Sequence, residues 1–571
     1  MTTDRALTVR RVMGIENEYG IVAPALPGVD SRELSRRLIA AYAGVLRARG
    51  IAGDIRWDYL GERPLQDVRG FVHSRDEVDP SLLTDDPSRP APSGPRPEDL
   101  TGGDGRRPHA VPRLTHFAEQ AARGTTTVLP NGARLYIDHG HPEYATPETT
   151  TPRGAVRADL AGDLAMVRAM DALTHGGSPE VLLYKNNQDG KGSAYGCHEN
   201  YIVDRAVPFE TLVAALVPFF VTRSTIVGSG RVGLGPMSGE PGYQLSQRAD
   251  FIETLLGIQT TLNRPIVNTR DEPHADSTRW RRLHVICGDA NCAPASTLLK
   301  LGTMSLILAV LERRGLPEEW AALALADPVE DFVRVSRDLG LSEPLLLADG
   351  SRRTALEIQH AYLDVVAREV RDGGTPPDPD TADILQRWER TLADLGAGWQ
   401  NAVGSVEWAA KRALLEARRA RDGLGWSAPE LAAMDLQWSD LRPERSLSAR
   451  LRGLGRLEEV VPLAEVAAAE FAPPEDTRAW FRGELIRRYP ERIHSASWQS
   501  IVVDLSDTPG VPAATRSNDW QGDGMVRIPL ANPVGGTRDR VATLLDDAAD
   551  LADLVATLTA PPAAPPAAPP R

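Results

Sequence analysis

The sequence predicts an α+β protein built on a mainly antiparallel sheet. Strand-like segments alternate with segments of helical periodicity over most of the chain, and this mixture favours one α+β body. The composition shifts from about residue 435, where a second, smaller region is expected. With 571 residues the chain exceeds a single ordinary core, so two or more domains are the expectation.

Each element can be placed by its pattern. The stretch GIENEYG at 14–20 is the first plausible strand, and the helical periodicity of residues 31–49 ends at Gly50. Further strands are expected over 133–140, 181–187, 200–205 and 282–288. Further helices are expected over 153–174, 297–314, 355–372, 382–395 and 406–421. Near the C-terminus, ASWQSIVVDLS at 496–506 and MVRIPL at 525–530 are strand-like.

Segments rich in proline and charge divide the chain further. Residues 85–108 are rich in Pro, Gly and charge and cannot bury a core, whereas RWDYLGERPLQDVRGF at 56–71 mixes aromatic and charged residues and can dock on a surface. The prediction is a catalytic domain over 1–434 with a flexible insertion over about 51–128. A small C-terminal domain over 435–558 and a disordered Pro/Ala tail over 559–571 follow.

Composition argues against several classes of protein. The net charge of −14 disfavours a general nucleic-acid or membrane binder, because both partners are anionic. No apolar run reaches 18 residues, and the start MTTDRALTVRR has no apolar signal core, so neither a transmembrane helix nor a secretory signal is expected. Three cysteines, Cys197, Cys287 and Cys292, suit a reducing cytoplasm and are interpreted as ordinary thiols rather than metal ligands.

Two carboxylates, Glu16 and Glu18, stand at alternate positions of the first expected strand. In an extended strand they share one face, and two like charges side by side are unfavourable unless something positive lies between them. The stretch NGARLYIDHGHPEYATPE at 131–148 has the same character, since Arg134, Tyr136 and Asp138 share a face opposite apolar residues. A solvated edge strand would explain the second stretch alone. The two together favour a Mg²⁺ site, because Mg²⁺ takes hard oxygen ligands.

Later stretches add basic and glycine-rich chemistry. GKGSAYGCHENY at 190–201 has a glycine-rich turn without the spacing of a phosphate-binding P-loop. NTRDEPHAD at 268–276 and RWRRLHVICGDAN at 279–291 bring Arg270, Arg281, Arg282 and His284. Guanidinium groups suit phosphate or carboxylate, although each cluster alone could be a surface feature.

Several of these motifs together resemble one known family. GIENEYG, NGARLYIDHGHPEYATPE, YKNNQDGKGSAYGCHENY, QLSQRADFIE, NTRDEPHAD, RRLHVICGDAN and FRGE are similar, in this order, to the Pup ligase and Pup deamidase/depupylase family. The resemblance implies a glutamine-synthetase-like fold with helices packed on one side of the sheet. It covers nearly the whole chain apart from the Pro-rich insert and the tail. The loop RWDYLGERPLQDVRGF, the turn HGHPEY after Asp138 and GSGRVGLGP at 228–236 resemble the deamidase/depupylase branch.

The family resemblance also implies the roles of individual residues. Asp138 matches the catalytic aspartate. The metal-site positions are Glu16, Glu18, Tyr136, Glu143 and His198. The nucleotide-contacting positions are Arg134, Thr146 and Trp498. The implied cofactors are ATP (or ADP) and Mg²⁺, and the implied reaction is hydrolysis of the side-chain amide at the C-terminal residue of Pup, the prokaryotic ubiquitin-like protein.

The implied partners are Pup and pupylated proteins, with the proteasomal ATPase as a further candidate. Because Pup is acidic, a basic groove is expected, and its candidates are Arg223, Arg231, Arg281, Arg282 and the segment AAKRALLEARRAR at 409–421. For that segment, a solvated helix face with i,i+4 ion pairs is an equal alternative. Three other functions remain open: a Pup–protein ligase, a small-molecule glutamate–amine ligase, and a non-catalytic adaptor.

Overall fold

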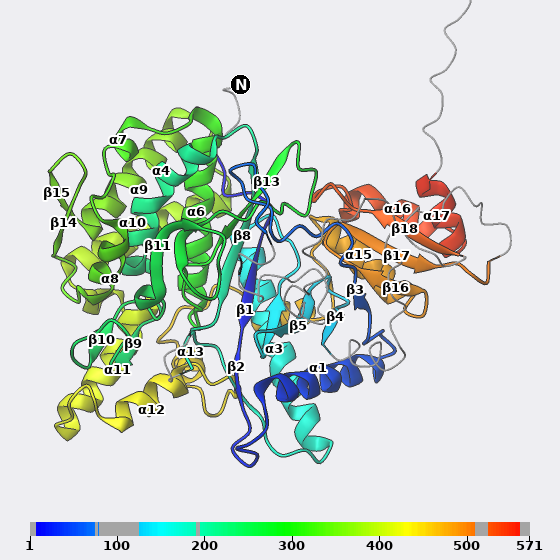
Figure 1. Cartoon of the computed structure of the whole chain (residues 1–571), viewed down its shortest axis with the longest axis horizontal. Coiled ribbons are helices and arrows are strands. Elements are labelled where there is room, and N and C mark those ends of the chain that lie inside the picture. The colour runs from blue at the N-terminus through cyan, green and yellow to red at the C-terminus, as the bar shows by residue number, and fades with distance from the viewer. Residues whose placement is uncertain (1–6, 75–77, 79–124, 190–193, 509–523, 560–571) are drawn as a thin grey trace, which may run out of the picture.

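A six-stranded sheet forms the centre of the protein, between a large helical region and a C-terminal cluster (Figure 1). The computed structural model describes residues 7–74, 78, 125–189, 194–508 and 524–559. The Pro-rich segment 85–108, the glycine-rich residues 190–193 and the tail 560–571 lie outside this description.

The central sheet has the strand order β13-β8-β1-β6-β5-β4, and every neighbouring pair is antiparallel. Its strands are β1 (Met13–Glu18), β4 (Thr126–Val128), β5 (Arg134–Asp138), β6 (His141–Ala145), β8 (Cys197–Asp204) and β13 (Trp280–Val285). The structure therefore confirms the α+β class and the mainly antiparallel sheet.

One face of this sheet is apolar and covered by helices. Leu135 and Tyr144 pack in one cluster with residues of α1 (Ser31–Arg47) and α3 (Pro152–His175), while Ile15 and Tyr201 pack with residues of α3 and α6 (Pro294–Arg314). The alternation of strand residues then leaves the opposite face to polar side chains. Within the described residues, helices thus cover the apolar face, as the family resemblance implies, and the polar face is left for chemistry.

A tight turn joins β5 to β6. Asp138 lies opposite His141 in the ladder, so only His139 and Gly140 form the loop, with φ of 47° and 90°. Positive φ at both central positions is the geometry of a type I′ hairpin, in which Asn-Gly and Gly-Gly are the usual residues. A non-glycine residue with positive φ is uncommon, although histidine adopts this conformation more often than most residues.

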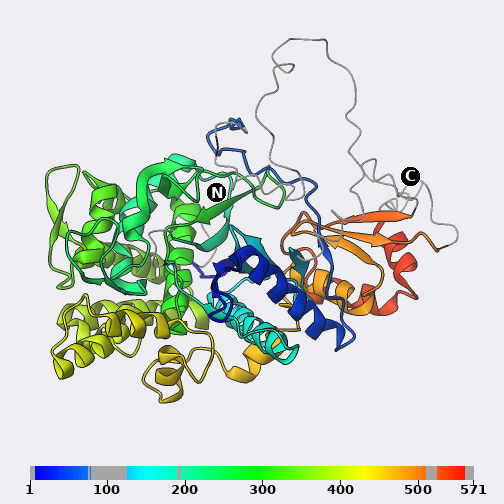
Figure 2. The same ribbon diagram turned by 60° about the horizontal axis from the view of Figure 1, so that its bottom comes forward.

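The helical region follows β8 in the chain and lies on the left in Figures 1 and 2. Its helices are α4 (Phe209–Thr222), α5 (Ser224–Val227), α6, α7 (Glu318–Ala321), α8 (Pro328–Arg337), α9 (Ala355–Asp372), α10 (Pro379–Ala397), α11 (Glu407–Asp422), α12 (Pro429–Trp438), α13 (Leu447–Gly453) and α14 (Leu463–Ala469), with the 3₁₀ turns η3 (Ala249–Phe251) and η4 (Trp399–Ala402). Short two-stranded sheets also occur outside the central sheet. They pair β2 (Gly20–Val22) with β7 (Leu182–Tyr184), β9 (Arg231–Gly233) with β10 (Gly242–Gln244), β11 (Ile252–Gly257) with β12 (Arg264–Asn268), and β14 (Pro344–Leu346) with β15 (Arg352–Thr354).

Within the described residues, α6 is the single helix long and apolar enough to cross a membrane. However, 94% of its most apolar window is buried inside the protein. Leu301, Leu306 and Ile307 of α6 are fully enclosed by neighbouring side chains. The apolar character of α6 is thus explained by its place in the core.

The C-terminal cluster includes a strand from the insertion. Its sheet has the order β18-β17-β16-β3, with β16 (Ile493–Ala496), β17 (Ser500–Asp504) and β18 (Met525–Pro529) from the C-terminal part and β3 (Arg56–Trp57) from the insertion. Helices α15 (Arg478–Arg488), α16 (Arg538–Asp547) and α17 (Leu551–Thr559) pack on it. The described part of the insertion therefore docks, as expected for RWDYLGERPLQDVRGF.

The packing also bears on the domain boundary predicted at residue 434. The hydrophobic cluster of the C-terminal sheet takes its members from Trp480 onward, together with Ile55, Trp57 and Val128. By contrast, α14 packs on α3, and α12 packs on α11. A boundary near residue 477 would follow this packing more closely than the predicted one.

Candidate active site

The polar face of the central sheet gathers the residues singled out from the sequence. Directly opposed residues of antiparallel strands share a face, and the register pairs Glu16 with His198, Glu18 with Glu143, and Glu143 with Tyr136. The side chains of this face are Glu16, Glu18, Arg134, Tyr136, Asp138, His141, Glu143, His198, Asn200, Arg282 and His284. All five predicted metal residues and the predicted catalytic Asp138 are thus brought onto one surface.

Glu16 lies at the centre of a histidine-rich group. His198 Nδ1 is 3.2 Å from one carboxylate oxygen of Glu16, and Asn200 Nδ2 donates to the other at 3.0 Å. Burial opposes ionisation of Glu16, but His198 and Arg282 outweigh it and lower its pKa. Glu16, His198 and His284 place one ligand atom each within 4.8 Å of the others.

Glu18 and Glu143 form the second carboxylate group. Glu18 accepts a hydrogen bond from the Gly196 amide at 2.6 Å, and its other carboxylate oxygen lies 3.3 Å from His141 Nδ1. Burial opposes ionisation of Glu18, but the nearby His141 lowers its pKa to about 2. Burial, followed by the charges of Asp138 and Glu18, raises the pKa of Glu143 well above its ordinary value.

These carboxylates fit a divalent cation. One carboxylate oxygen of Glu143 is buried without a hydrogen-bond partner, and a buried oxygen of this kind is costly to leave unpaired. A cation beside Glu143 would remove the repulsion that now raises its pKa. Carboxylate oxygens are the ligands that Mg²⁺ prefers, while the His198 and His284 pair would also suit softer divalent metals.

Asp138 ends β5 at the edge of this group. His139 Nδ1 lies 2.9 Å from Asp138 Oδ2, and the side chains of both residues are partly exposed, at 28% and 23%. Glu18, Asp138 and His139 each place one ligand atom within 4.8 Å of the other two. A carboxylate that is close to the cation-binding residues and open to solvent is suited to meet a substrate amide.

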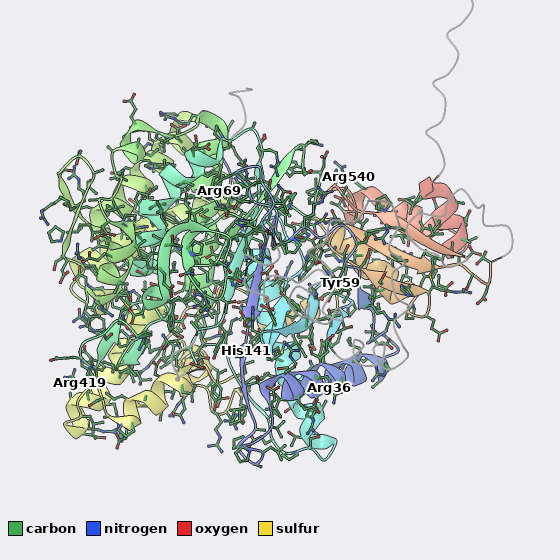
Figure 3. The ribbon with its side chains drawn as sticks, viewed as in Figure 1. Arg36, Tyr59, Arg69, His141, Arg419 and Arg540 are labelled. Carbon is green, nitrogen blue, oxygen red and sulfur yellow. The ribbon has the colours of Figure 1, made fainter. Side chains whose placement is uncertain are left out.

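Arg134 is enclosed by aromatic rings of the insertion and the sheet. Its guanidinium carbon lies 4.1 Å from the ring centres of both Trp57 and Tyr136. Trp57 in turn makes an edge contact with Trp498, with centroids 5.1 Å apart. In Figure 3, Tyr59, whose hydroxyl accepts a hydrogen bond from Arg134 at 3.3 Å, lies close to β5. Trp57 and Tyr59 of the insertion therefore contact Arg134, the predicted phosphate-binding residue.

A cavity at the end of the polar face contains the other two predicted nucleotide residues. Glu16, Thr146, Asn200, Arg282 and Trp498 are among its lining residues. Thr146 uses its hydroxyl within the fold, accepting a hydrogen bond from the Ile15 amide at 2.9 Å. Arg134 is not among the residues lining this cavity. The cavity thus groups Thr146 and Trp498 with Glu16, a predicted metal ligand, while Arg134 lies next to it against Trp57 and Tyr59 of the insertion.

The expectation of a basic groove is wrong for three of its candidates. Arg223, Arg231 and Arg281 are buried, and each serves an internal partner. Arg223 pairs with Glu199 beneath the sheet, Arg231 pairs with Asp250, and Arg281 donates to the Val207 carbonyl. A buried cation needs such a partner, so these side chains are not free to line a surface.

The α11 candidate also lies away from the site. In Figure 3, Arg419 is at the lower-left tip of the molecule, whereas His141 is near the middle. The charges of this helix are engaged locally, in i,i+4 pairs between Arg412 and Glu416 and between Arg418 and Asp422. These pairs match the alternative of a solvated helix face.

Sequence reasoning did not assign a role to several residues that the site contains. In the sequence, His284 belongs to an arginine-rich stretch. In the structure it lies in the group around Glu16. Its strand RRLHV alternates Arg282 and His284 with apolar residues, and that alternation was the available signal. Glu148 pairs with Arg478 at 2.7 Å and with Arg482, which ties the end of the polar face to α15.

Comparison with known proteins gives one consistent result. A family model described as Pup-ligase protein matches residues 11–502. The depupylase of Acidothermus cellulolyticus is 43% identical over 553 residues, covering 96% of this chain and 99% of that protein. The Pup deamidase/depupylase of Mycolicibacterium smegmatis is 42% identical over 551 residues, covering 96% and 99%. The Pup–protein ligase of Acidimicrobium ferrooxidans is 40% identical over 395 residues, covering 67% and 84%.

Two solved structures share the fold. The complex between the prokaryotic ubiquitin-like protein Pup and its ligase PafA superposes with a TM-score of 0.70 at 28% identity, covering 95% of this chain and 92% of that chain. The Pup ligase PafA in complex with ADP gives a TM-score of 0.64 at 31% identity, covering 78% and 97%.

Proposed function

Since this chain belongs to the Pup-ligase protein family, we propose that it is the hydrolytic member of that family rather than a ligase. It deamidates the C-terminal glutamine of Pup to glutamate and cleaves the isopeptide bond between Pup and substrate lysines. The observation that carries this function is the extent of similarity. Named depupylases match over 96% of the chain, whereas the ligase of Acidimicrobium ferrooxidans matches over 67%.

The polar face supports nucleotide binding beside a cation. A related ligase was solved with ADP, and the cavity that contains Thr146 and Trp498 opens beside Glu16. We assign Glu16, Glu18, Glu143 and His198 to hold Mg²⁺, with Tyr136 opposite Glu143 in the ladder. When bound, Mg²⁺ neutralises the phosphates and the carboxylates together. Arg134 is suited to phosphate because its guanidinium binds such groups bidentately.

Asp138 is the proposed catalytic residue. Its carboxylate is partly exposed at the edge of the site, where it can attack an amide carbonyl or deprotonate a water that does so. Hydrolysis of glutamine releases ammonia, and hydrolysis of the isopeptide releases a lysine amine. A single turnover in H₂¹⁸O separates the two roles. A nucleophilic Asp138 expels the amine and forms an anhydride with Pup, which hydroxylamine traps and which gives ¹⁸O in Asp138 when water opens it at the Asp138 carbonyl. A base forms no anhydride and leaves Asp138 unlabelled, with ¹⁸O only on Pup.

The function is tested with the purified full chain. Incubation with Pup ending in glutamine, and separately with a pupylated protein, is followed by intact mass with and without Mg-ATP. We expect a gain of about 1 Da on Pup and release of the unmodified protein, both dependent on Mg-ATP. No change in either substrate would refute the hydrolytic function.

A Pup–protein ligase is the second candidate function, because the solved relatives are ligases. It predicts that Pup ending in glutamate becomes attached to an acceptor protein with consumption of ATP, in the same mass assay. Steady ATP turnover with a free amino acid would instead indicate a small-molecule ligase. Binding of the proteasomal ATPase remains a separate proposal, which a pull-down with that ATPase tests.

A further inference from the structure

We propose that His139, held by Thr261, is the positioning residue that fixes the carboxylate of Asp138 for reaction. This inference rests on the proposed function of Asp138, and it adds two residues that the family resemblance does not assign.

The first observation is the conformation of the turn. His139 occupies the first central position of the two-residue β5–β6 turn with φ of 47°, and Gly140 follows with φ of 90°. Asparagine or glycine fits such a turn at lower cost than histidine. Strained residues of this kind cluster at active sites, where the surrounding structure must hold them. The turn itself therefore does not explain why a histidine stands there.

The second observation is what the imidazole contacts. His139 Nδ1 lies 2.9 Å from Asp138 Oδ2, and His139 Nε2 lies 3.3 Å from Thr261 Oγ1. Thr261 belongs to the loop between β11 and β12, which is 122 residues away in sequence. The ring thus joins two separate loops at the reacting carboxylate. When an imidazole nitrogen faces a carboxylate in this way, it limits the rotation of that carboxylate.

The third observation is that the positive φ and the contact with Asp138 belong to the same residue, His139, at the end of β5. The positive φ and the contact with Asp138 Oδ2 are thus parts of one arrangement. The expected result is one fixed carboxylate orientation, with the other oxygen of Asp138 left for the substrate.

The turn offers unusually clean variants. His139→Gly removes the imidazole at a position that favours glycine, so the hairpin should fold without loss of thermal stability. His139→Asn also suits the turn and retains a nitrogen near the place of Nδ1. Thr261→Val removes the hydroxyl with little change of shape, and Thr261→Ser keeps it. Each variant therefore separates the side-chain contact from the fold.

The experiment measures kcat and KM for deamidation of Pup ending in glutamine, with saturating Mg-ATP, alongside thermal unfolding. We expect His139→Gly to lower kcat by about 100-fold, as for a misplaced reacting group, with KM within about twofold of the parent value and an unchanged or raised Tm. The kcat of His139→Asn should be at least tenfold higher than that of His139→Gly. Thr261→Val should lower kcat severalfold, and Thr261→Ser should not.

Specific outcomes would overturn the proposal. His139→Gly with parental kcat would show that the ring does not position Asp138. Complete loss in Thr261→Val, with normal turnover in His139→Gly, would make Thr261 a reacting group in its own right. If the parent protein hydrolysed no Pup amide, the proposed function would fail instead. Crystal structures of the parent and His139→Gly would then still decide the positioning role, since it requires Asp138 to change rotamer in the variant.

Discussion

Glu143 of β6 lies directly opposite Glu18 of β1, and one carboxylate oxygen of Glu143 is buried without a hydrogen-bond partner. The burial of Glu143 and the charges of Asp138 and Glu18 raise its pKa well above the ordinary value. Two facing carboxylates in this state fit a cation, and protonation of Glu143 would compete with cation binding.

The first prediction concerns that sensitivity. Because Glu143 takes up a proton more readily without a cation, Mg²⁺ binding should release protons, and affinity for Mg-ATP should rise with pH. Calorimetry in two buffers of different ionisation enthalpy measures the release. Glu143→Gln should abolish most of it. Equal apparent enthalpies in both buffers for the parent protein would contradict the prediction.

The second prediction concerns Glu16 and Glu18. Glu16→Gln and Glu18→Gln should each weaken Mg-ATP binding, because each removes a negative oxygen ligand, and raised Mg²⁺ should partly restore it. Titration calorimetry gives the affinities. Glu240→Gln, a change at an exposed residue of the β9–β10 loop, is the control and should bind normally. Parental affinity in both site variants would remove these residues from the metal site.

Asp138→Asn is the third prediction. An amide of the same shape can neither attack a carbonyl nor accept a proton, so deamidation and depupylation should both fall by at least about 1,000-fold. Nucleotide binding should stay within about threefold of the parent value. Intact mass measures turnover, and near-normal turnover would show that another group performs the chemistry.

The fourth prediction contrasts two parts of the insertion. Trp57→Ala should lower deamidation at least tenfold, because Trp57 stacks on Arg134 and touches Trp498. Ile55→Ala is the matched control, since Ile55 is buried in the same cluster without contacting Arg134 in this way. Deletion of residues 85–108 should leave activity almost unchanged, because that segment has too few apolar residues to pack. Equal, parental rates in all three proteins would assign the insertion no catalytic part.

Two charged residues of the docked segment have internal partners. Arg69 pairs with the buried Asp67 at 2.7 Å, and Asp58 pairs with Arg527 and Ser500. Both are internal contacts of the insertion and its neighbours. Arg69→Ala should therefore change activity much less than Trp57→Ala.

The fifth prediction concerns pH and stability. Burial opposes ionisation of Glu148, but Arg482 and Arg478 outweigh it and lower its pKa to about 2. A lowered pKa gives stability that is present above the unfolded value of 4.5 and is lost as pH falls toward 2. Glu148→Gln should thus cost on the order of 3 kcal/mol in denaturant unfolding at pH 7 and clearly less at pH 3. A difference that is independent of pH would contradict the assignment.

The sequence pattern alone predicted those helices and strands whose bounds are set by interactions between residues close together in the chain. The helix predicted over 355–372 has these bounds in the structure, because Thr354 and Glu357 form a capping box at its start. The alternation in 134–138 likewise predicted which side chains share the polar face. In such segments the period of the sequence is itself the structural constraint.

Long-range pairing could not be derived in this way. No local feature of Arg56–Trp57 indicates that it joins β16 in parallel, because the pairing partner lies at the far end of the chain. The same limit explains the error at Arg223, whose partner Glu199 sits beneath the sheet. A charge pattern reports that a cation is present, whereas its burial depends on which distant carboxylate it meets.

The insertion strand β3 has a consequence for synthesis on the ribosome. Asp58 and Ser500, which hydrogen-bond to each other, are 442 residues apart. At roughly 5–20 residues per second, about 20–90 s pass between the emergence of the two segments. During that interval Trp57 has neither β16 nor Trp498 beside it, so the nascent catalytic body carries an exposed aromatic segment. A product truncated before residue 493 would keep this segment uncovered and would be a natural substrate for chaperones.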